Sequence, residues 1–216
     1  MKRLEGPYFA PRAGGAPKKL VVLLHGLGAD GQDLIGLAPE LSRRLPEAAF
    51  FAPDAPWPCD MAPFGRQWFS LQDRRPESML AGVQKAAPLL DAYLDHLLER
   101  HRLASTDLAL LGFSQGTMMA LHLAPRRAAP VAAVLGYSGA LVAPERLPRE
   151  VVSRPPVMLI HGDADEVVPV EALFAAVAAL QQVEIPVQWL LRPGLGHAID
   201  PVGLAAGARF LADMLA

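Results

Sequence analysis

The chain has 216 residues, of which 52% are hydrophobic and 19% are charged, and its formal net charge is −2. This length is that of one domain and leaves no room for a second large one. The apolar fraction is too high for a disordered chain. Because acidic and basic residues nearly balance, the chain has no electrostatic footprint for nucleic acid or for an anionic membrane surface. We therefore predict a single domain over residues 1–216.

Three features of the sequence bear on the cellular compartment. Residues 1–17 lack the apolar core of a signal peptide, and we expect them to form an N-terminal arm or an edge segment. No uninterrupted apolar stretch approaches the roughly 18 residues of a membrane-spanning helix. The single cysteine, Cys59, excludes an intramolecular disulfide. The sequence therefore predicts a cytoplasmic protein, because disulfides are rare in that compartment.

Short apolar runs alternate with longer runs of helical periodicity, which is typical of a mostly parallel sheet with helices on both faces. The expected strands are residues 20–24, 49–52, 108–111, 131–136, 157–160 and 187–191. The expected helices are residues 34–45, 78–102, 115–124, 170–182 and 202–215. Residues 53–63 contain four prolines, which exclude a helix and leave large apolar side chains on a loop. We predict an α/β fold without a large cap domain.

The most specific motif follows the expected strand 108–111. Residues 112–116 read Gly-Phe-Ser-Gln-Gly, and a helix-like sequence comes next. G-x-S-x-G between a strand and a helix is typical of a nucleophile elbow, a sharp turn that presents its serine at the carboxyl edge of the sheet. Gly112 and Gly116 remove side chains that would collide in such a turn. We therefore predict that Ser114 is a nucleophile.

A serine nucleophile needs a base and a carboxylate that orients the base, and both follow in the order Ser, Asp, His. The run His-Gly-Asp-Ala-Asp at 161–165 comes after one expected strand, and His197 lies on a glycine-flanked loop after the next. Asp165 is favoured as the orienting carboxylate, with Asp163 as the alternative that shapes the turn.

The other histidines have simpler interpretations. His96, His101 and His122 fall on expected helices, where a solvated or packed side chain is the ordinary outcome. His161 could join the two neighbouring acids as a metal ligand, but a metal site needs more ligands and an oriented outer shell. The sequence therefore predicts no metal and no organic cofactor.

Acyl transfer also needs two hydrogen-bond donors for the oxyanion. One is the N–H of Gln115, the residue after the serine. The second candidate is the N–H of Leu27, in the glycine-rich run His-Gly-Leu-Gly-Ala-Asp-Gly at 25–31. A phosphate-binding loop is the alternative for this run, but it lacks the G-x-G-x-x-G spacing and the P-loop lysine. We expect His25 to support the loop by hydrogen bonding.

Four motifs in order, at 25–31, 112–116, 161–169 and 194–197, resemble the phospholipase/carboxylesterase family of α/β-hydrolases, which includes acyl-protein thioesterases. The resemblance covers about residues 20–215. It implies the α/β-hydrolase fold and hydrolysis of carboxylic esters, with Ser114, Asp165 and His197 as triad and the amides of Leu27 and Gln115 as oxyanion hole. It also makes a homodimer plausible.

The proline-rich loop and the segment after it are the expected source of an acyl pocket, because they combine large apolar side chains with no place in a strand. The nominated residues are Trp57, Met61, Phe64, Trp68, Phe69 and Leu71. Ordinary packing beneath a long loop is the alternative.

We predict a serine carboxylesterase that acts on small esters with short to medium acyl chains. A lysophospholipase or acyl-protein thioesterase is the alternative, because it would share every catalytic residue. A non-catalytic binding module on a hydrolase scaffold is a more remote alternative, and the intact triad argues against it.

Overall fold

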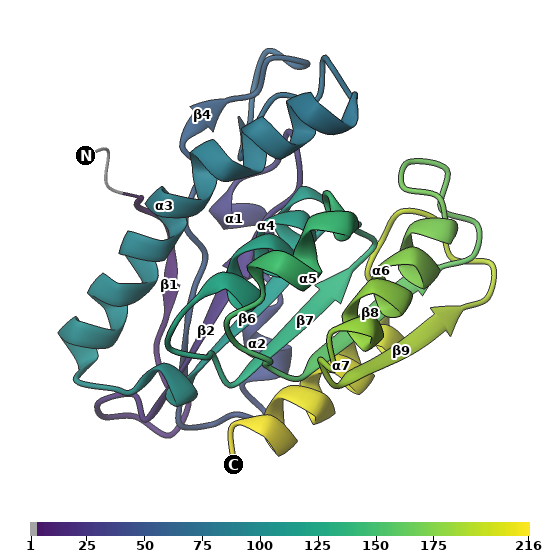
Figure 1. The fold of residues 1–216 in the computed structure, drawn as a ribbon. Coiled ribbons are helices and arrows are strands. Elements are labelled where there is room, and N and C mark those ends of the chain that lie inside the picture. Colours follow the sequence, from purple (N-terminus) through teal and green to yellow (C-terminus); the bar gives the residue numbers. More distant parts are fainter. Residues whose placement is uncertain (1–3) are drawn as a thin grey trace.

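A computed structural model describes residues 4–216 and has a seven-stranded sheet at its centre (Figure 1). The strand order is β1-β3-β2-β6-β7-β8-β9, and only β1 runs antiparallel to its neighbour. These strands are β1 (Tyr8–Phe9), β2 (Lys19–Leu24), β3 (Ala48–Phe51), β6 (Leu108–Phe113), β7 (Ala133–Tyr137), β8 (Val157–Gly162) and β9 (Val187–Arg192). A separate two-stranded ribbon joins β4 (Trp57–Pro58) to β5 (Arg66–Gln67). This mostly parallel sheet confirms the predicted fold class.

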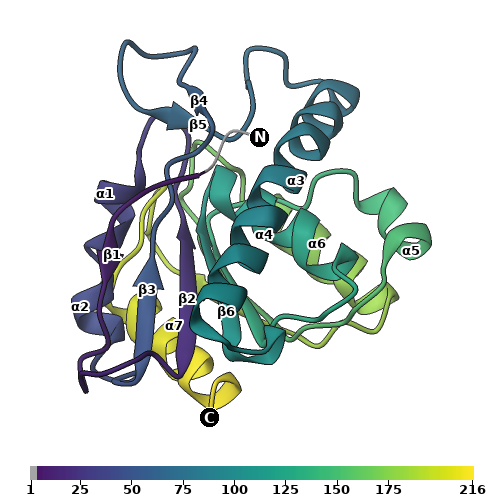
Figure 2. The ribbon, with the colours of Figure 1, turned by 90° about the vertical axis from the view of Figure 1, so that its left-hand side faces the viewer.

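Helices cover both faces of the sheet. They are α1 (Gly31–Ile35), α2 (Ala38–Leu41), α3 (Pro76–His101), α4 (Gln115–Leu123), α5 (Leu147–Glu150), α6 (Glu171–Gln182) and α7 (Pro201–Met214). Short 3₁₀ helices occupy Ser105–Asp107, Ala124–Arg126 and Pro144–Arg146. Figure 2 shows α1 and α2 on one side of the sheet and α3, α4 and α6 on the other. No helix in residues 4–216 is long and apolar enough to cross a membrane.

The alternation of side chains along β2 shows how the sheet feeds two cores. Leu20, Val22 and Leu24 pack into the cluster that contains α3, α4 and α6. Val21 and Leu23 point the other way, into the cluster that contains α1, α2 and α7. All five side chains are fully buried. A strand that is apolar on both faces needs this double cover, and its continuous hydrophobic run is the expected signature.

The expectation of one helix over residues 34–45 is wrong. The structure has two short helices there, α1 and α2, interrupted at Gly36 and Leu37. Pro39 lies in the first turn of α2, and because proline has no N–H it cannot continue the hydrogen bonding of α1. A proline at the first turn marks the start of a helix, so this break has a signal in the sequence.

The N-terminal segment is an edge of the sheet where the structure describes it. Tyr8 and Phe9 pair antiparallel with Phe51 and Phe50, and residues 1–3 of the expected arm lie outside the described residues. The ribbon of β4 and β5, like β1, was not expected from the sequence because its strands have only two residues each.

Candidate active site

Ser114 occupies the turn between β6 and α4, at the carboxyl edge of the sheet. Its backbone has φ 53° and ψ −116°, a conformation that a residue with a side chain rarely adopts. The Ser114 N–H donates to the carbonyl of Tyr137 at 2.9 Å, which ties the turn to the neighbouring strand β7. The Ser114 side chain makes no capping hydrogen bond to α4. Strain held in place by surrounding structure is typical of a nucleophile elbow.

Both glycines of the elbow lie so close to neighbouring backbone that a side chain would not fit. A Cβ atom on Gly116 would overlap the carbonyl oxygen of Leu24 at the end of β2. A Cβ atom on Gly112 would overlap the backbone of Gly116 and Thr117. Helix α4 therefore packs on the sheet at a distance that only glycine permits.

Asp165 and His197 meet at the same edge of the sheet. Asp165 follows β8 and is buried, and its Oδ2 lies 2.8 Å from Nδ1 of His197 on the loop after β9. Oδ1 of Asp165 accepts the amides of Val167 and Val168, each at 2.9 Å. Because the carboxylate fixes the hydrogen on Nδ1, Nε2 of a neutral His197 ring carries the free lone pair.

Two opposing effects act on the Asp165 carboxylate. Burial favours its neutral form, but hydrogen bonds from His197 and from the amides of Val168 and Val167 outweigh burial and lower the pKa of Asp165. The carboxylate is therefore ionised at neutral pH, which is the state that can hold an imidazolium.

Asp163 and His161 have hydrogen-bond partners of their own, although Nε2 of His161 also lies 3.4 Å from Oδ2 of Asp165. Asp163 accepts the N–H of Gly194 at 2.6 Å and so links the two loops that carry Asp165 and His197. His161, which is buried at the end of β8, donates from Nε2 to the carbonyl of Val168 at 2.8 Å. Within residues 4–216, no group of three or more His, Cys, Asp or Glu side chains is arranged to hold a metal ion.

Two backbone amides border the same site. The N–H of Gln115 lies in the first turn of α4, where a helix leaves its amides without acceptors. Leu27 lies on the turn after β2, and its N–H has no backbone acceptor among the described residues. His25 supports this turn, because its Nδ1 donates to Gly26 O at 2.7 Å and its Nε2 accepts the Ala55 N–H at 2.9 Å. Burial lowers the pKa of His25, so the ring is neutral.

A cavity of about 360 Å³ brings these groups together. Ser114, His197, Leu27 and Gly26 all line it, as do the apolar residues Ala29, Leu71, Met79, Phe113, Met118, Ala140, Val167, Val168, Pro169 and Ala172. The ring of Phe113 packs 4.9 Å from the His197 ring, centroid to centroid. The cavity thus has a serine, a histidine held by a carboxylate and the residue Leu27 on its wall, and Gln115 follows the serine directly in the chain. Acyl transfer needs such a set of groups.

Comparison with known proteins agrees with this geometry. Residues 11–215 match the family described as Phospholipase/Carboxylesterase. The chain belongs to this family. It is a hydrolase that acts on ester bonds.

Individual relatives are consistent with that assignment. The crystal structure of esterase PE8 is 43% identical, covers 99% of this chain and 100% of its own, and has a TM-score of 0.94. Esterase YpfH of Escherichia coli (strain K12) is 27% identical over 85% of this chain and 77% of its own length. Acyl-protein thioesterase 1 of Gibberella zeae is 26% identical over 90% of each chain.

The nominated acyl-pocket residues of this esterase divide into four groups, and only Leu71 lines the cavity beside Ser114. Trp68 is a correction: it is fully buried in the core, and its Nε1–H donates to His25 O at 3.0 Å. Met61 and Phe64 are also corrections, because their side chains are 50% and 73% exposed at the tip of the β4–β5 loop.

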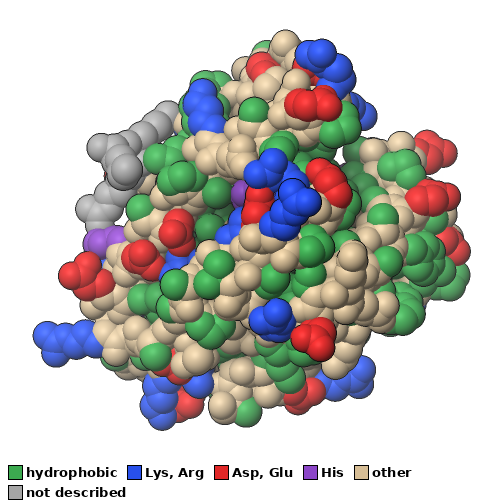
Figure 3. All heavy atoms as spheres, in the orientation of Figure 1, with side chains coloured by type: hydrophobic (Ala, Val, Ile, Leu, Met, Phe, Trp, Pro, Cys, Tyr) green, Lys and Arg blue, Asp and Glu red, His purple; other side chains and the backbone are tan. Residues whose placement is uncertain are grey.

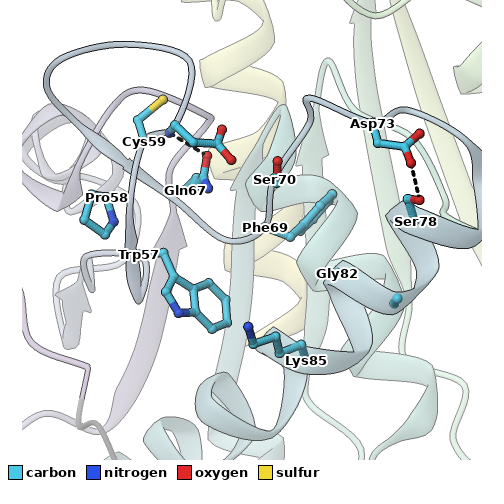
Figure 4. A pocket seen from close by; sticks show the side chains of 12 residues that line it. Trp57, Pro58, Cys59, Gln67, Phe69, Ser70, Asp73, Ser78, Gly82 and Lys85 are labelled. Carbon is cyan, nitrogen blue, oxygen red and sulfur yellow. Dashed lines mark hydrogen bonds between the residues drawn. The ribbon is translucent and has the colours of Figure 1, made fainter.

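Trp57 and Phe69 line a second cavity of about 620 Å³, which also includes Gln67 and Ser70 of the segment 66–71 (Figure 4). Its walls include Ser70 and Gly82, and Nζ of Lys85 lies 4.9 Å from the centre of the Trp57 ring. Ser114 and His197 are absent from these walls. These two nominated residues therefore belong to a different pocket, which is a further correction.

Some residues that line the cavity beside Ser114 were not predicted. The sequence patterns that could have indicated them differ from one residue to the next. Met118 lies one helical turn after Ser114, so the spacing alone places it on the same side of α4. Val167, Val168 and Pro169 follow Asp165 directly in the motif already noted. Met79 belongs to α3, far away in the sequence, and no local pattern indicates that it reaches the serine.

Proposed function

We propose that this esterase hydrolyses small carboxylic esters through an acyl-enzyme, with Ser114 as nucleophile, His197 as base and Asp165 as the group that orients His197. The observation that carries the proposal is the 2.8 Å contact between Asp165 Oδ2 and His197 Nδ1 on a cavity that Ser114 also lines. A histidine fixed in this tautomer presents Nε2 to the serine hydroxyl.

In the first half of the reaction, Ser114 Oγ attacks the ester carbonyl carbon while His197 Nε2 takes the hydroxyl proton. The carbonyl oxygen becomes an oxyanion, which accepts hydrogen bonds from the N–H groups of Leu27 and Gln115. The intermediate collapses, the bond to the alcohol oxygen breaks, and the imidazolium gives its proton to the leaving alcohol. Asp165 stabilises the imidazolium without taking the proton.

In the second half, water attacks the acyl carbon of the acyl-enzyme. His197 takes a proton from the water and returns it to Ser114 Oγ as the carboxylic acid departs. The N–H groups of Leu27 and Gln115 again hold the oxyanion. Neither half requires a cofactor, because every proton moves between Ser114, water, substrate and His197.

The size of the cavity supports short to medium acyl chains. About 360 Å³ lies near the lower end of the 300–1,000 Å³ usual for ligand pockets. Its walls are mostly apolar, from Met79, Met118 and Val168 among others. The similarity to an acyl-protein thioesterase supports the alternative of a longer acyl group held as a thioester.

The test combines one variant with a series of p-nitrophenyl esters. S114A should lose at least about 10³-fold in kcat and remain folded, whereas the control S105A, in the 3₁₀ helix before β6, should keep wild-type rates. In the wild type, kcat/KM should be highest for the butyrate or octanoate ester. Substantial turnover by S114A would refute the nucleophile, and a maximum at the palmitate ester would favour the long-chain alternative.

We also propose the cytoplasm as the location and a homodimer as the assembly. The first rests on the single cysteine, which is half-buried. The second rests on exposed apolar side chains such as Phe174 on α6 and Trp189 on the edge strand β9, each 48% exposed. Figure 3 shows hydrophobic side chains at the surface on the α6 side of the molecule. Light scattering on the purified protein would test the dimer.

A further inference from the structure

Arg74 is an unusual member of the cavity that Ser114 and His197 line. It lies two residues before α3 and is exposed, and it is the only Lys, Arg, Asp or Glu on the described wall of that cavity. Leu71 and Met79, on either side of it in the sequence, line the same wall. Asp73 and Ser78, by contrast, line the second cavity, the one beside Trp57.

The charge of Arg74 is not neutralised by a neighbour. Among the described residues its guanidinium has no hydrogen bond or ion pair, although Asp73 is adjacent in the sequence. The Asp73 carboxylate is held by Arg75, with Nη2 at 2.6 Å and Nε at 3.0 Å from its oxygens. It also accepts the Ser78 hydroxyl at 2.6 Å. These bonds from Arg75 and Ser78 hold the pKa of Asp73 well below its usual value.

The position of Arg74 is not explained by helix stability. α3 has 26 residues and begins at Pro76, so the positive end of its dipole points towards the segment that holds Arg74. A cation at that end of a helix is unfavourable, and Arg75 is offset by Asp73 whereas Arg74 is not. An unpaired arginine and a helix N-terminus together give this side of the cavity a positive potential.

We propose that Arg74 selects esters that carry a second, anionic group, a carboxylate or a phosphate, away from the bond that is cleaved. This inference rests on the proposed function of Ser114. The anion forms a charge-assisted pair with the guanidinium while the apolar part of the substrate contacts Leu71 and Met79. Arg74 thereby sets substrate preference and takes no part in proton transfer.

The test uses two pairs of matched esters at pH 8. The acyl arm compares mono-p-nitrophenyl adipate with its neutral terminal amide. The alcohol arm compares 4-acetoxybenzoate with 4-acetoxybenzamide. In at least one arm the wild type should prefer the anionic ester in kcat/KM by about twofold to fivefold, the range expected for a partly exposed ion pair. The arm that shows the preference identifies the side of the ester that faces Arg74.

The variants R74Q and R74E separate charge from structure. R74Q should abolish the preference through a higher KM for the anionic ester, with neutral esters cleaved at the wild-type rate, and R74E should reverse it. R209Q is the matched control, because Arg209 is an exposed arginine of α7 outside the cavity wall. The wild-type preference should also shrink as salt is raised.

The outcomes that would overturn this inference differ from those that concern Ser114. No preference in either arm of the wild type, or a preference kept in R74Q, would refute the role of Arg74 even if S114A is inactive. Melting temperatures of R74Q and R74E at or above the wild-type value would show that the variants are folded, because removal of an unfavourable cation near this helix end should not destabilise the protein.

Discussion

At the residue scale, Asp165 explains why two loops from different strands form one site. Its two carboxylate oxygens bind different parts of the site, since Oδ1 accepts two amides of its own turn and Oδ2 contacts His197. Asp163 joins the same loops through Gly194. The loop of His197 is thus tied to the loop of Asp165 at two points, which restricts the freedom of the His197 ring.

His122, a buried histidine outside the site, makes the stability of the protein depend on pH. His122 of α4 is 4% exposed, and burial together with the charge of Arg126 lowers its pKa to about 4. The unfolded chain binds this proton at higher pH than the folded chain, so protonation favours unfolding as pH falls below the usual histidine value of about 6.5. The free energy of unfolding should therefore fall by on the order of 2 kcal/mol from this group between pH 7 and pH 5.

The variant H122L should remove that part of the acid sensitivity. Leucine is a better helix former and adds no polar atom, whereas Nδ1 of His122 is buried without a partner among the described residues. Urea unfolding at pH 7 and pH 5 measures the effect. If H122L and the wild type lose equal stability between pH 7 and pH 5, the pKa of His122 is not lowered in the folded protein.

At the element scale, the segment 66–71 is fixed to the elbow. The Gln115 side chain is fully buried, accepting the Trp68 N–H and donating to the carbonyl of Phe69, both at 2.8 Å. Trp68 in turn bonds His25 O, below the turn of Leu27. The turn of Ser114, the turn of Leu27 and one wall of the cavity are therefore joined by hydrogen bonds, which favours a fixed wall over a mobile lid.

Because α4 lies so close to β2, we expect a side chain at position 116 to disrupt their packing. G116A should lower the melting temperature by many degrees and abolish ester hydrolysis, because the new methyl group would displace α4 from Leu24. G36A is the control: Gly36 has helical backbone with φ −57°, and the nearest atom to a new Cβ is 3.3 Å away. A G116A enzyme with wild-type stability and activity would contradict this description of the elbow.

The sequence predicts the parts of this fold that depend on local pattern. The six expected strands are confirmed with boundary shifts of one or two residues, and the strand–turn–helix context of Ser114 is local as well. The acyl-pocket residues could not be predicted, because bonds from His25 and Gln115, 43 or more residues away in the sequence, set which way Trp68 and Phe69 face. The break between α1 and α2 could have been predicted from Pro39, but the helical spacing of apolar residues over 34–45 favoured one continuous helix.

At the scale of the whole molecule, the large apolar fraction divides between two cores. One contains α3, α4 and α6, and the other contains α1, α2 and α7. The sheet lies between them, and its carboxyl edge carries the turns of Leu27, Ser114, Asp165 and His197. A small remainder of the apolar side chains lines the cavity beside Ser114. The fold therefore concentrates its reactive groups at one edge while most of its apolar side chains serve packing.

We propose that one serine of the seven in the chain, Ser114, is an activated nucleophile. The most direct measurement is reaction with a fluorophosphonate, followed by mass spectrometry of the intact protein and of its peptides. The reagent should add to one serine per chain, in the peptide that contains Ser114, and hydrolysis of p-nitrophenyl butyrate should cease as labelling completes. Label on a different serine, or continued hydrolysis by fully labelled protein, would show that Ser114 is not the nucleophile.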